Sequence, residues 1–280
     1  MQPKKSDSPF QIRSFSIEEV SAMTRISADV GWNQPEEEIR EVILRSGKYL
    51  TGAFLNGELA GTAAAYPYPD TGTAFINEVI VESRSRRQGA AMRMLEELIP
   101  MTERDFSVLR LYATDMGRPL YEKFGFEPYA ILAFGSLTDP EKDRVSDSHI
   151  TPFSDNDLPE IVRLDKENFG SDRTSLLHSL AAKNLEDAWT LRRKGEINGF
   201  ILRGPMSWLL QTHSTKDMAS LIHFANRNSP RGPSDVLIHQ AHIPNLPGQF
   251  QLHFTLTAMQ RGNRLPPPGI TCGSMLPDIG

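Results

Sequence analysis

The sequence predicts an α/β fold with a mixed, mostly antiparallel central sheet flanked by helices, and it predicts two such units in the chain. Three observations carry this prediction. A hairpin signature at Asn56-Gly57 lies between two strand-like runs, an Ile/Val-rich run is followed directly by a basic loop and an amphipathic helix, and short features recur at a constant displacement along the chain. At roughly 150 residues per domain, a chain of 280 residues also favours two domains.

The composition is that of a globular protein. Hydrophobic residues make up 39% of the chain, which excludes disorder, collagen and coiled coil as descriptions of the whole. No apolar run approaches the roughly 18 residues of a membrane helix, and the first residues lack the apolar core of a signal peptide. The single cysteine, Cys272, excludes an internal disulfide and a Cys-rich zinc site. We therefore expect a cytoplasmic protein without a membrane partner.

The charge is distributed unevenly. Residues 1–145 hold 17 Lys and Arg against 22 Asp and Glu, whereas residues 146–280 hold 13 of each. An acidic first part argues against a nucleic-acid partner and favours a small cationic one. The sequence leaves a homodimer open. We place the domain boundary in the charge-rich stretch from Asp139 to Ser148, so the predicted domains are residues 1–145 and 146–280.

The first predicted elements form a meander. Asn56-Gly57 is the dipeptide of a two-residue turn whose central residues both take positive φ, and it predicts a hairpin of strands Tyr49–Leu55 and Glu58–Tyr66. After a cluster of turn residues, the apolar run Ala74–Val81 predicts a third, central strand.

The repeat is faint but consistent. Phe15-Ser16 recurs as Phe153-Ser154, and Gly57–Gly61 recurs as Gly195–Gly199 at the same displacement. In both copies a serine that can cap a helix is followed by acidic residues of the first helical turn. Two matches at one displacement indicate a duplicated unit.

The segment after the third strand carries the binding chemistry. Arginines and small residues run from Ser83 to Ala91, and a helix is predicted by the apolar stripe of Ala91, Met94, Leu95 and Leu98. A helix start with small residues exposes backbone N–H groups to an anion, so a diphosphate is the natural ligand. Neither of the familiar glycine-rich loops for ATP or NAD occurs.

Here the sequence resembles the GNAT superfamily of acetyl-CoA-dependent N-acetyltransferases. Arg86–Ala91 matches the R-x-x-G-x-A form of its pyrophosphate loop, and Leu120–Phe126 is similar to its L-Y-E-K-x-G-F signature. Ala113–Pro119, together with segments near Trp32 and Phe169, is similar to a subgroup that has a second, GNAT-like C-terminal domain. The resemblance implies a GNAT fold followed by such a domain.

The resemblance also implies a ligand and its contacts. Acetyl-CoA would be the co-substrate, and Tyr121 would be the general acid that protonates the departing thiolate; the alternative role of Tyr121 is packing. The implied acetyl-CoA contacts are three strand residues for the pantetheine arm, the loop and helix start for the pyrophosphate, and a hydroxyl in place of the family's usual Asn: Val79, Ile80, Val81, Arg86, Arg87, Gln88, Gly89, Ala90, Ala91, Met92 and Thr114.

A base is also needed, because an amine arrives as an ammonium ion with a pKa near 10. Glu78 lies inside an otherwise apolar strand, where burial would raise its pKa and fit it to accept a proton. The alternatives are a carboxylate that faces solvent or an arginine, with the amine deprotonated by solvent. No motif indicates a metal site.

The sequence therefore predicts an N-acetyltransferase that acts on a small primary amine in a ternary complex. The alternatives are an acyl-CoA-binding or sensing protein without catalysis, and a protein or peptide N-acetyltransferase. The second domain lacks a pyrophosphate loop: Arg86–Ala91, shifted by the displacement of the repeat, falls on Phe224–Ser229, which contains no glycine. We expect this domain to bind no cofactor and to cover the cleft of the first; the alternative is a stabilising or dimerising lobe.

Overall fold

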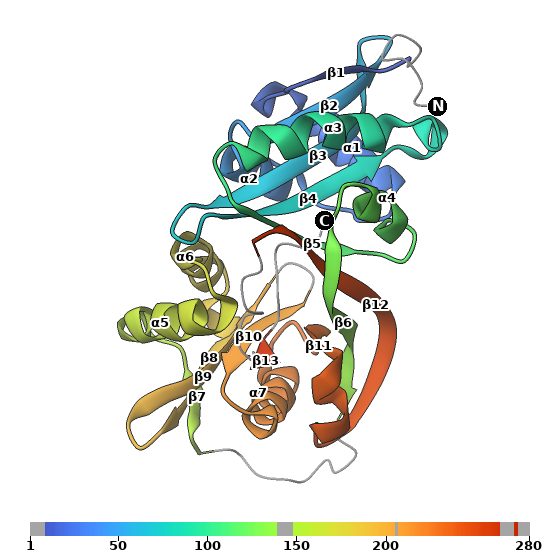
Figure 1. Cartoon of the computed structure of the whole chain (residues 1–280). Coiled ribbons are helices and arrows are strands. Elements are labelled where there is room, and N and C mark those ends of the chain that lie inside the picture. Colours follow the sequence, from blue (N-terminus) through green and yellow to red (C-terminus); the bar gives the residue numbers. More distant parts are fainter. Residues whose placement is uncertain (1–8, 139–147, 205–206, 264–271, 274–280) are drawn as a thin grey trace.

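The computed structural model describes residues 9–138, 148–204, 207–263 and 272–273. Its strands form one mixed, mostly antiparallel 13-stranded sheet in the order β1-β2-β3-β4-β5-β12-β6-β11-β10-β9-β8-β7, with β13 paired to β10 (Figure 1). The fold class predicted from the sequence is confirmed. No helix in the described part of the chain is long and apolar enough to span a membrane.

The first half of the chain builds one end of this sheet. Its strands are β1 (Gln11–Arg13), β2 (Leu50–Leu55), β3 (Glu58–Tyr68), β4 (Thr73–Val81), β5 (Val108–Ala113) and β6 (Glu127–Thr138), and its helices are α1 (Val20–Asp29), α2 (Glu36–Ser46), α3 (Ala90–Glu103) and α4 (Arg118–Lys123), with single 3-10 turns at Ile17–Glu19 and Ser83–Ser85.

The second half builds the other end of the sheet. Its strands are β7 (Ile150–Pro152), β8 (Ala188–Arg193), β9 (Glu196–Arg203), β10 (Trp208–Thr212), β11 (Val236–His239), β12 (Gln249–Gly262) and β13 (Cys272–Gly273), and its helices are α5 (Leu158–Phe169), α6 (Thr174–Lys183) and α7 (Thr215–Asn228), with 3-10 segments at Asp155–Asp157, Leu185–Asp187 and Gln240–Asn245.

The repeat in the sequence is also a repeat in the structure. Asn56 and Gly57 both have positive φ, and so do Lys194 and Gly195 at the equivalent turn. A bulge interrupts the β2–β3 pairing between Ala53 and Phe54, and the β8–β9 pairing is interrupted at the equivalent place, between Leu191 and Arg192. Capping boxes on Ser16 and Ser154 begin the two helical segments. The displacement seen in the sequence therefore holds from β1 through the start of β3.

Beyond that point the displacement changes, which corrects one step of the sequence analysis. α3 and α7 have 14 residues each, but they begin at Ala90 and Thr215, which is a shorter displacement than the one that relates the two hairpins. Phe224–Asn228 therefore lies in the last turns of α7 and is not the counterpart of the loop before α3. That counterpart is the short connection His213-Ser214, where the Ser214 side chain accepts the Asp217 N–H. The second half therefore has only two residues where the first half has the loop before α3.

The two halves share a strand. β12 lies between β5 and β6 and pairs antiparallel with both, over Thr257–Gly262 with β5 and over Gln249–Gln260 with β6 (Figure 1). The end of the second half thus completes the sheet of the first. The division at residue 145 stays a prediction; residues 139–147 of the predicted boundary stretch lie outside the described residues.

Helices cover both faces of the sheet. In the first half, α1 and α2 pack on one face over a core that includes Met23, Ile39 and Phe75. α3 packs on the opposite face, where its apolar stripe meets Met259 of β12. In the second half, α7 covers one face, and α5 and α6 cover the other. The site described below uses both faces of the first half.

Candidate active site

The central feature of the site is a gap between two parallel strands. β4 and β5 pair only from Thr73 to Phe75 and from Val108 to Arg110, and in the described structure their later residues do not pair with each other. The β3–β4 pairing is irregular at the same level, because the register shifts between Thr62 and Ala64. The end of β4 therefore has one unpaired edge, which a ligand can pair with.

A buried carboxylate organises the loop that follows β4. Glu82 accepts hydrogen bonds from Arg25 (3.0 Å), Arg84 (2.8 Å) and Ser85 (2.8 Å). Burial alone would raise the pKa of Glu82, but these three bonds outweigh it and the pKa is lowered. Asp29 adds a fourth contact by accepting the Ser83 N–H at 2.6 Å. The loop is therefore held in one conformation before any ligand binds, which reduces the entropy lost on binding.

The start of α3 is open to an anion. Gly89 precedes the helix with φ +85°, and a Cβ built on it would have no heavy atom within 4 Å. Residues 86–89 are exposed, and the first intrahelical bond of this turn is Arg93 N–H to Gly89 C=O. The earlier N–H groups of the turn have no carbonyl one turn back, as at any helix start. This geometry fits a diphosphate, as the sequence predicts.

Glu78 lies at the irregular point of β4 and is the most unusual carboxylate in the site. It is 1% exposed and has φ +51°, which a non-glycine residue adopts at a cost of about 1–3 kcal/mol. Its Oε1 accepts the Gln34 amide at 3.2 Å, and its Oε2 has no hydrogen-bond partner among the described residues. Burial raises the pKa of Glu78 to about 7, against the opposing effect of the Gln34 bond. The burial that the sequence analysis required is present.

This burial predicts a pH-dependent stability. Glu78 has a pKa of about 7 when folded and about 4.5 when exposed, so between these values the folded state binds more protons. The contribution of Glu78 to the stability of the folded state is therefore fully present below about pH 4.5, and it is lost as the pH rises through about 7. Relative to Glu78→Gln, the wild type should lose on the order of 3 kcal/mol between pH 4.5 and pH 8. Urea unfolding of both proteins at the two pH values measures this; parallel pH profiles would contradict it.

Tyr121 lies on the other face of the sheet. It belongs to α4, is half-buried, and packs edge-on against Phe126 at 6.0 Å in the cluster beneath α3. Burial raises the pKa of Tyr121 above its ordinary value of 10, so its hydroxyl keeps its proton throughout the neutral range. Glu78 and Tyr121 thus lie on opposite faces of the sheet.

Thr114 directly follows β5 and is exposed. Its hydroxyl oxygen already accepts the Gly117 N–H at 3.1 Å. The hydroxyl hydrogen can still donate one bond to a ligand. The predicted acetyl-CoA contacts of Thr114 and of the residues in β4 and the loop stay predictions, because no ligand is present.

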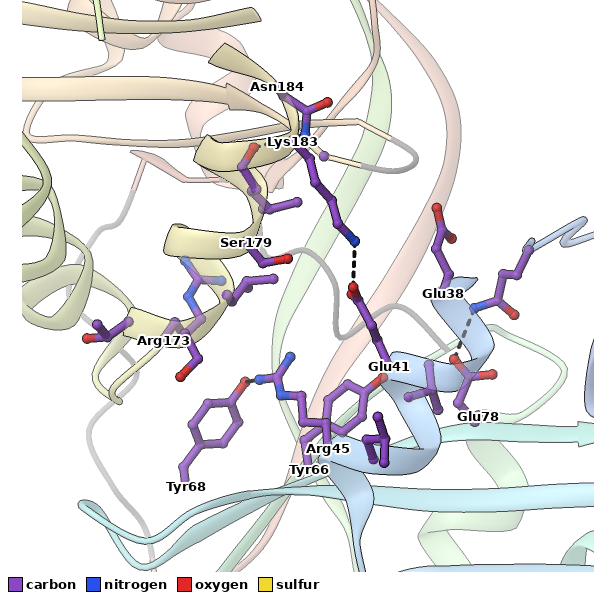
Figure 2. A pocket seen from close by; sticks show the side chains of 18 of the residues that line it. Glu38, Glu41, Arg45, Tyr66, Tyr68, Glu78, Arg173, Ser179, Lys183 and Asn184 are labelled. Carbon is purple, nitrogen blue, oxygen red and sulfur yellow. Dashed lines mark hydrogen bonds and ion pairs between the residues drawn. The ribbon is translucent and has the colours of Figure 1, made fainter. Parts of the chain in front are cut away.

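A large cleft opens on the α2 side of the gap. It has a volume of about 1380 Å³ and is lined by α2, the β3–β4 hairpin and Glu78 from the first half, and by α6 from the second (Figure 2). Lys183 of α6 joins Glu37 (3.2 Å) and Glu41 (2.5 Å) of α2 across it. The cleft therefore has a wall from each half of the chain.

Sequence reasoning missed several polar groups of this region. Gln34 holds Glu78 in place, and its own oxygen accepts the Ser27 hydroxyl at 2.7 Å. Asn77 and Arg110 are buried on β4 and β5, and the Asn77 amide and Arg110 Nε have no partner among the described residues. The only signal for any of them was the Gly31–Gln34 segment, which belongs to the subgroup resemblance.

Among the described residues no group of three or more His, Cys, Asp or Glu side chains could hold a metal.

Comparison with known protein families identifies the family of the region that contains the β4–β5 gap. Residues 17–126 match the model of the "Acetyltransferase (GNAT) family". Residues 17–126 are a GNAT acetyltransferase domain. This GNAT domain contains the gap, the loop and the start of α3, and its family is one of acyltransferases. The chain is also 26% identical over 189 residues to an uncharacterized N-acetyltransferase, YitH, of Bacillus subtilis (strain 168), an alignment that covers 65% of this chain and 64% of that protein.

Solved structures extend the likeness beyond the GNAT domain. A putative acetyltransferase from Pyrococcus horikoshii superposes with a TM-score of 0.80 at 20% identity, covering 100% of this chain and 99% of that one. A GCN5-related N-acetyltransferase from Sphaerobacter thermophilus has a TM-score of 0.61 at 14% identity and covers 95% and 98%. These likenesses show that the whole two-part fold, and not only the GNAT domain, occurs in other proteins.

Proposed function

We propose that the protein transfers the acetyl group of acetyl-CoA to a primary amine of a small molecule bound in the cleft between the halves. The observation that carries this is Glu78, a buried carboxylate that lines the cleft beyond the end of the β4–β5 pairing and has one oxygen without a partner among the described residues. Acetyl-CoA, when bound, supplies a thioester carbonyl; its pyrophosphate would lie on residues 87–92 and its pantetheine arm along Val79–Val81.

In this proposal the proton acceptor, Glu78, and the proton donor, Tyr121, act from opposite faces of the sheet. The amine nitrogen attacks the carbonyl carbon, and Glu78 accepts a proton from that nitrogen, directly or through water. The carbon–sulfur bond breaks, and Tyr121 donates its proton to the sulfur so that free thiol leaves. Glu78 reaches the reaction from the cleft and Tyr121 from the α3 side, which fits an acceptor and a leaving group on opposite sides of the carbonyl.

The second half of the chain forms one wall of the proposed acceptor site, which supports the proposal. α6 lines the cleft, and Lys183 pairs with Glu37 and Glu41 of α2 across it. Excluding water from the thioester limits hydrolysis. The direct test of the function is release of free thiol from acetyl-CoA across a panel of primary amines, with an amine-free control for hydrolysis. No thiol release above that control with any amine would contradict the proposal.

Replacing Tyr121 with phenylalanine should lower the turnover number about 10²–10⁴-fold, because the change removes the proton donor and keeps the ring. The affinity for acetyl-CoA should change little, since the ring still packs against Phe126. Steady-state kinetics at saturating substrates measure the first effect and calorimetry the second. An unchanged turnover number would leave Tyr121 with a packing role only.

Replacing Glu78 with glutamine should lower kcat/KM most near pH 8 and little near pH 5.5. The wild-type carboxylate is an effective base only once it is ionised, so wild-type activity should rise as the pH passes about 7. The variant should lack this rise and retain only the slower increase caused by the free-amine fraction. Profiles of kcat/KM from pH 5.5 to 9 test this. A rise through pH 7 that persists in the variant would assign it to another group.

A further inference from the structure

The basic side chains of the cleft already have partners. Five of them line it, and each contacts an acidic or aromatic group: Arg45 lies 4.2 Å from the ring centre of Tyr66, Arg173 pairs with Asp165, Lys183 pairs with Glu37 and Glu41, and Arg203 and Arg231 both pair with Asp187. The cleft therefore offers little unpaired positive charge to a ligand.

Two carboxylates of the cleft differ from these. Glu78 keeps one buried oxygen that has no hydrogen-bond partner among the described residues. Glu38 of α2 is half-buried, lines the same cleft, and has neither a hydrogen bond nor an ion pair with any described residue. The two side chains interact electrostatically, so they lie near each other (Figure 2). Burial, followed by the charge of Glu41, raises the pKa of Glu38, while Lys183 opposes this.

We infer that the acceptor carries a second positive charge, and that Glu38 binds this distal cation while the reacting amine lies at Glu78. The inference rests on the proposed function for the role of Glu78 as a base. An unpaired carboxylate that is partly removed from water is costly and gains most from a cationic partner. Trp32 also lines the cleft, and an indole ring is a favourable neighbour for an ammonium group. Glu38 is thus a specificity-determining residue for diamines or longer polyamines.

Arg110 is a buried cation near the cleft, and a cation would favour an acceptor with a carboxylate at its distal end. Arg110 lies in a separate cavity of about 10 Å³ that is lined in part by Tyr68, which also lines the cleft. A cavity of that size accommodates about one water molecule and not a carboxylate. A distal carboxylate on the acceptor is therefore disfavoured, and the experiment includes it as a competing outcome.

The test compares three amines of equal length: 1,5-diaminopentane, 1-aminopentane and 5-aminopentanoate. They place an ammonium, a methyl and a carboxylate group at the distal end. The wild type should prefer the diamine over the other two by about tenfold in kcat/KM. Glu38→Gln should lower kcat/KM for the diamine about tenfold and change that for 1-aminopentane far less. Binding of each amine to the CoA-bound protein, measured by calorimetry, should follow the same order.

Glu37→Gln is the matched control. It removes the same charge one position away on α2, from an exposed side chain whose Lys183 partner keeps Glu41. It should leave the diamine preference intact. Equal losses in both variants, equal losses for both amines, a preference for 5-aminopentanoate, or no amine binding would each overturn the inference. Glu38-dependent diamine binding without thiol release would retain the inference and contradict the proposed function.

Discussion

Replacing Gly89 with glutamate is expected to abolish acetyl-CoA binding while the protein stays folded. The side chain would project into open space, because a Cβ at this position meets no heavy atom within 4 Å. It would place a carboxylate where the diphosphate is expected, at a cost of about 4 kcal/mol for like charges some 4 Å apart near a surface. Calorimetric titration with CoA should show one site per chain in the wild type and none in the variant.

Gly89→Ala separates charge from backbone strain. Gly89 has φ +85°, so alanine carries the strain of this conformation without the carboxylate. We expect alanine to weaken CoA binding far less than glutamate, and both variants to keep a cooperative thermal transition. CoA affinity that is unchanged in a folded Gly89→Glu protein would mean that the pyrophosphate lies elsewhere.

Removing β12 by ending the chain after residue 248 is expected to prevent the GNAT domain from folding. β12 provides the partner of β5 along its whole length and of most of β6, so its loss opens two strand edges in the middle of the sheet. It also removes Leu256, Ala258 and Met259, which are buried in the cores on both faces. Urea unfolding of the truncated chain should show no cooperative transition, and CoA binding should be absent.

Point substitutions within β12 test, without truncation, whether this strand stabilises the GNAT domain. Met259→Ala should destabilise the protein by about 2–5 kcal/mol, because Met259 is fully buried in the cluster beneath α3. Leu252→Ala on the same strand is the control, since Leu252 is 50% exposed and should tolerate the change within about 0.5 kcal/mol. A truncated chain that folds cooperatively and binds CoA would show that the GNAT domain is complete without β12.

The local elements could be predicted from the sequence because their signals are local. Asn56-Gly57 predicted the hairpin of β2 and β3, and the apolar run to Val81 predicted β4 to within one residue. The constant displacement between the two copies predicted the second hairpin, and the structure adds that its turn at Lys194-Gly195 has positive φ, like that of the first. The constant displacement gave the wrong counterpart for the loop before α3, because the equivalent connection in the second half is shorter and a constant displacement cannot reveal a difference in length.

The remaining features depend on residues far apart in the sequence. Nothing near β12 indicates that it pairs with β5 and β6 more than a hundred residues earlier, because backbone pairing leaves no composition signal of its own. Glu78 was identifiable as a carboxylate in an apolar strand, but its orientation depends on Gln34, 44 positions away. Glu38 is one of three glutamates in the first turn of α2, and only the tertiary fold distinguishes the one that faces the cleft.

The position of β12 also constrains the order of folding during synthesis. The part of the sheet built by the first half is incomplete until β12, which ends at Gly262, has left the ribosome. The edges of β5 and β6 that pair with β12 therefore stay unpaired while more than a hundred further residues are synthesised. Contacts this distant in sequence slow folding and leave exposed strand edges open to intermolecular pairing. We expect a nascent chain stalled before residue 249 to remain protease-sensitive and to bind chaperones, with protection appearing for both halves together once β12 emerges.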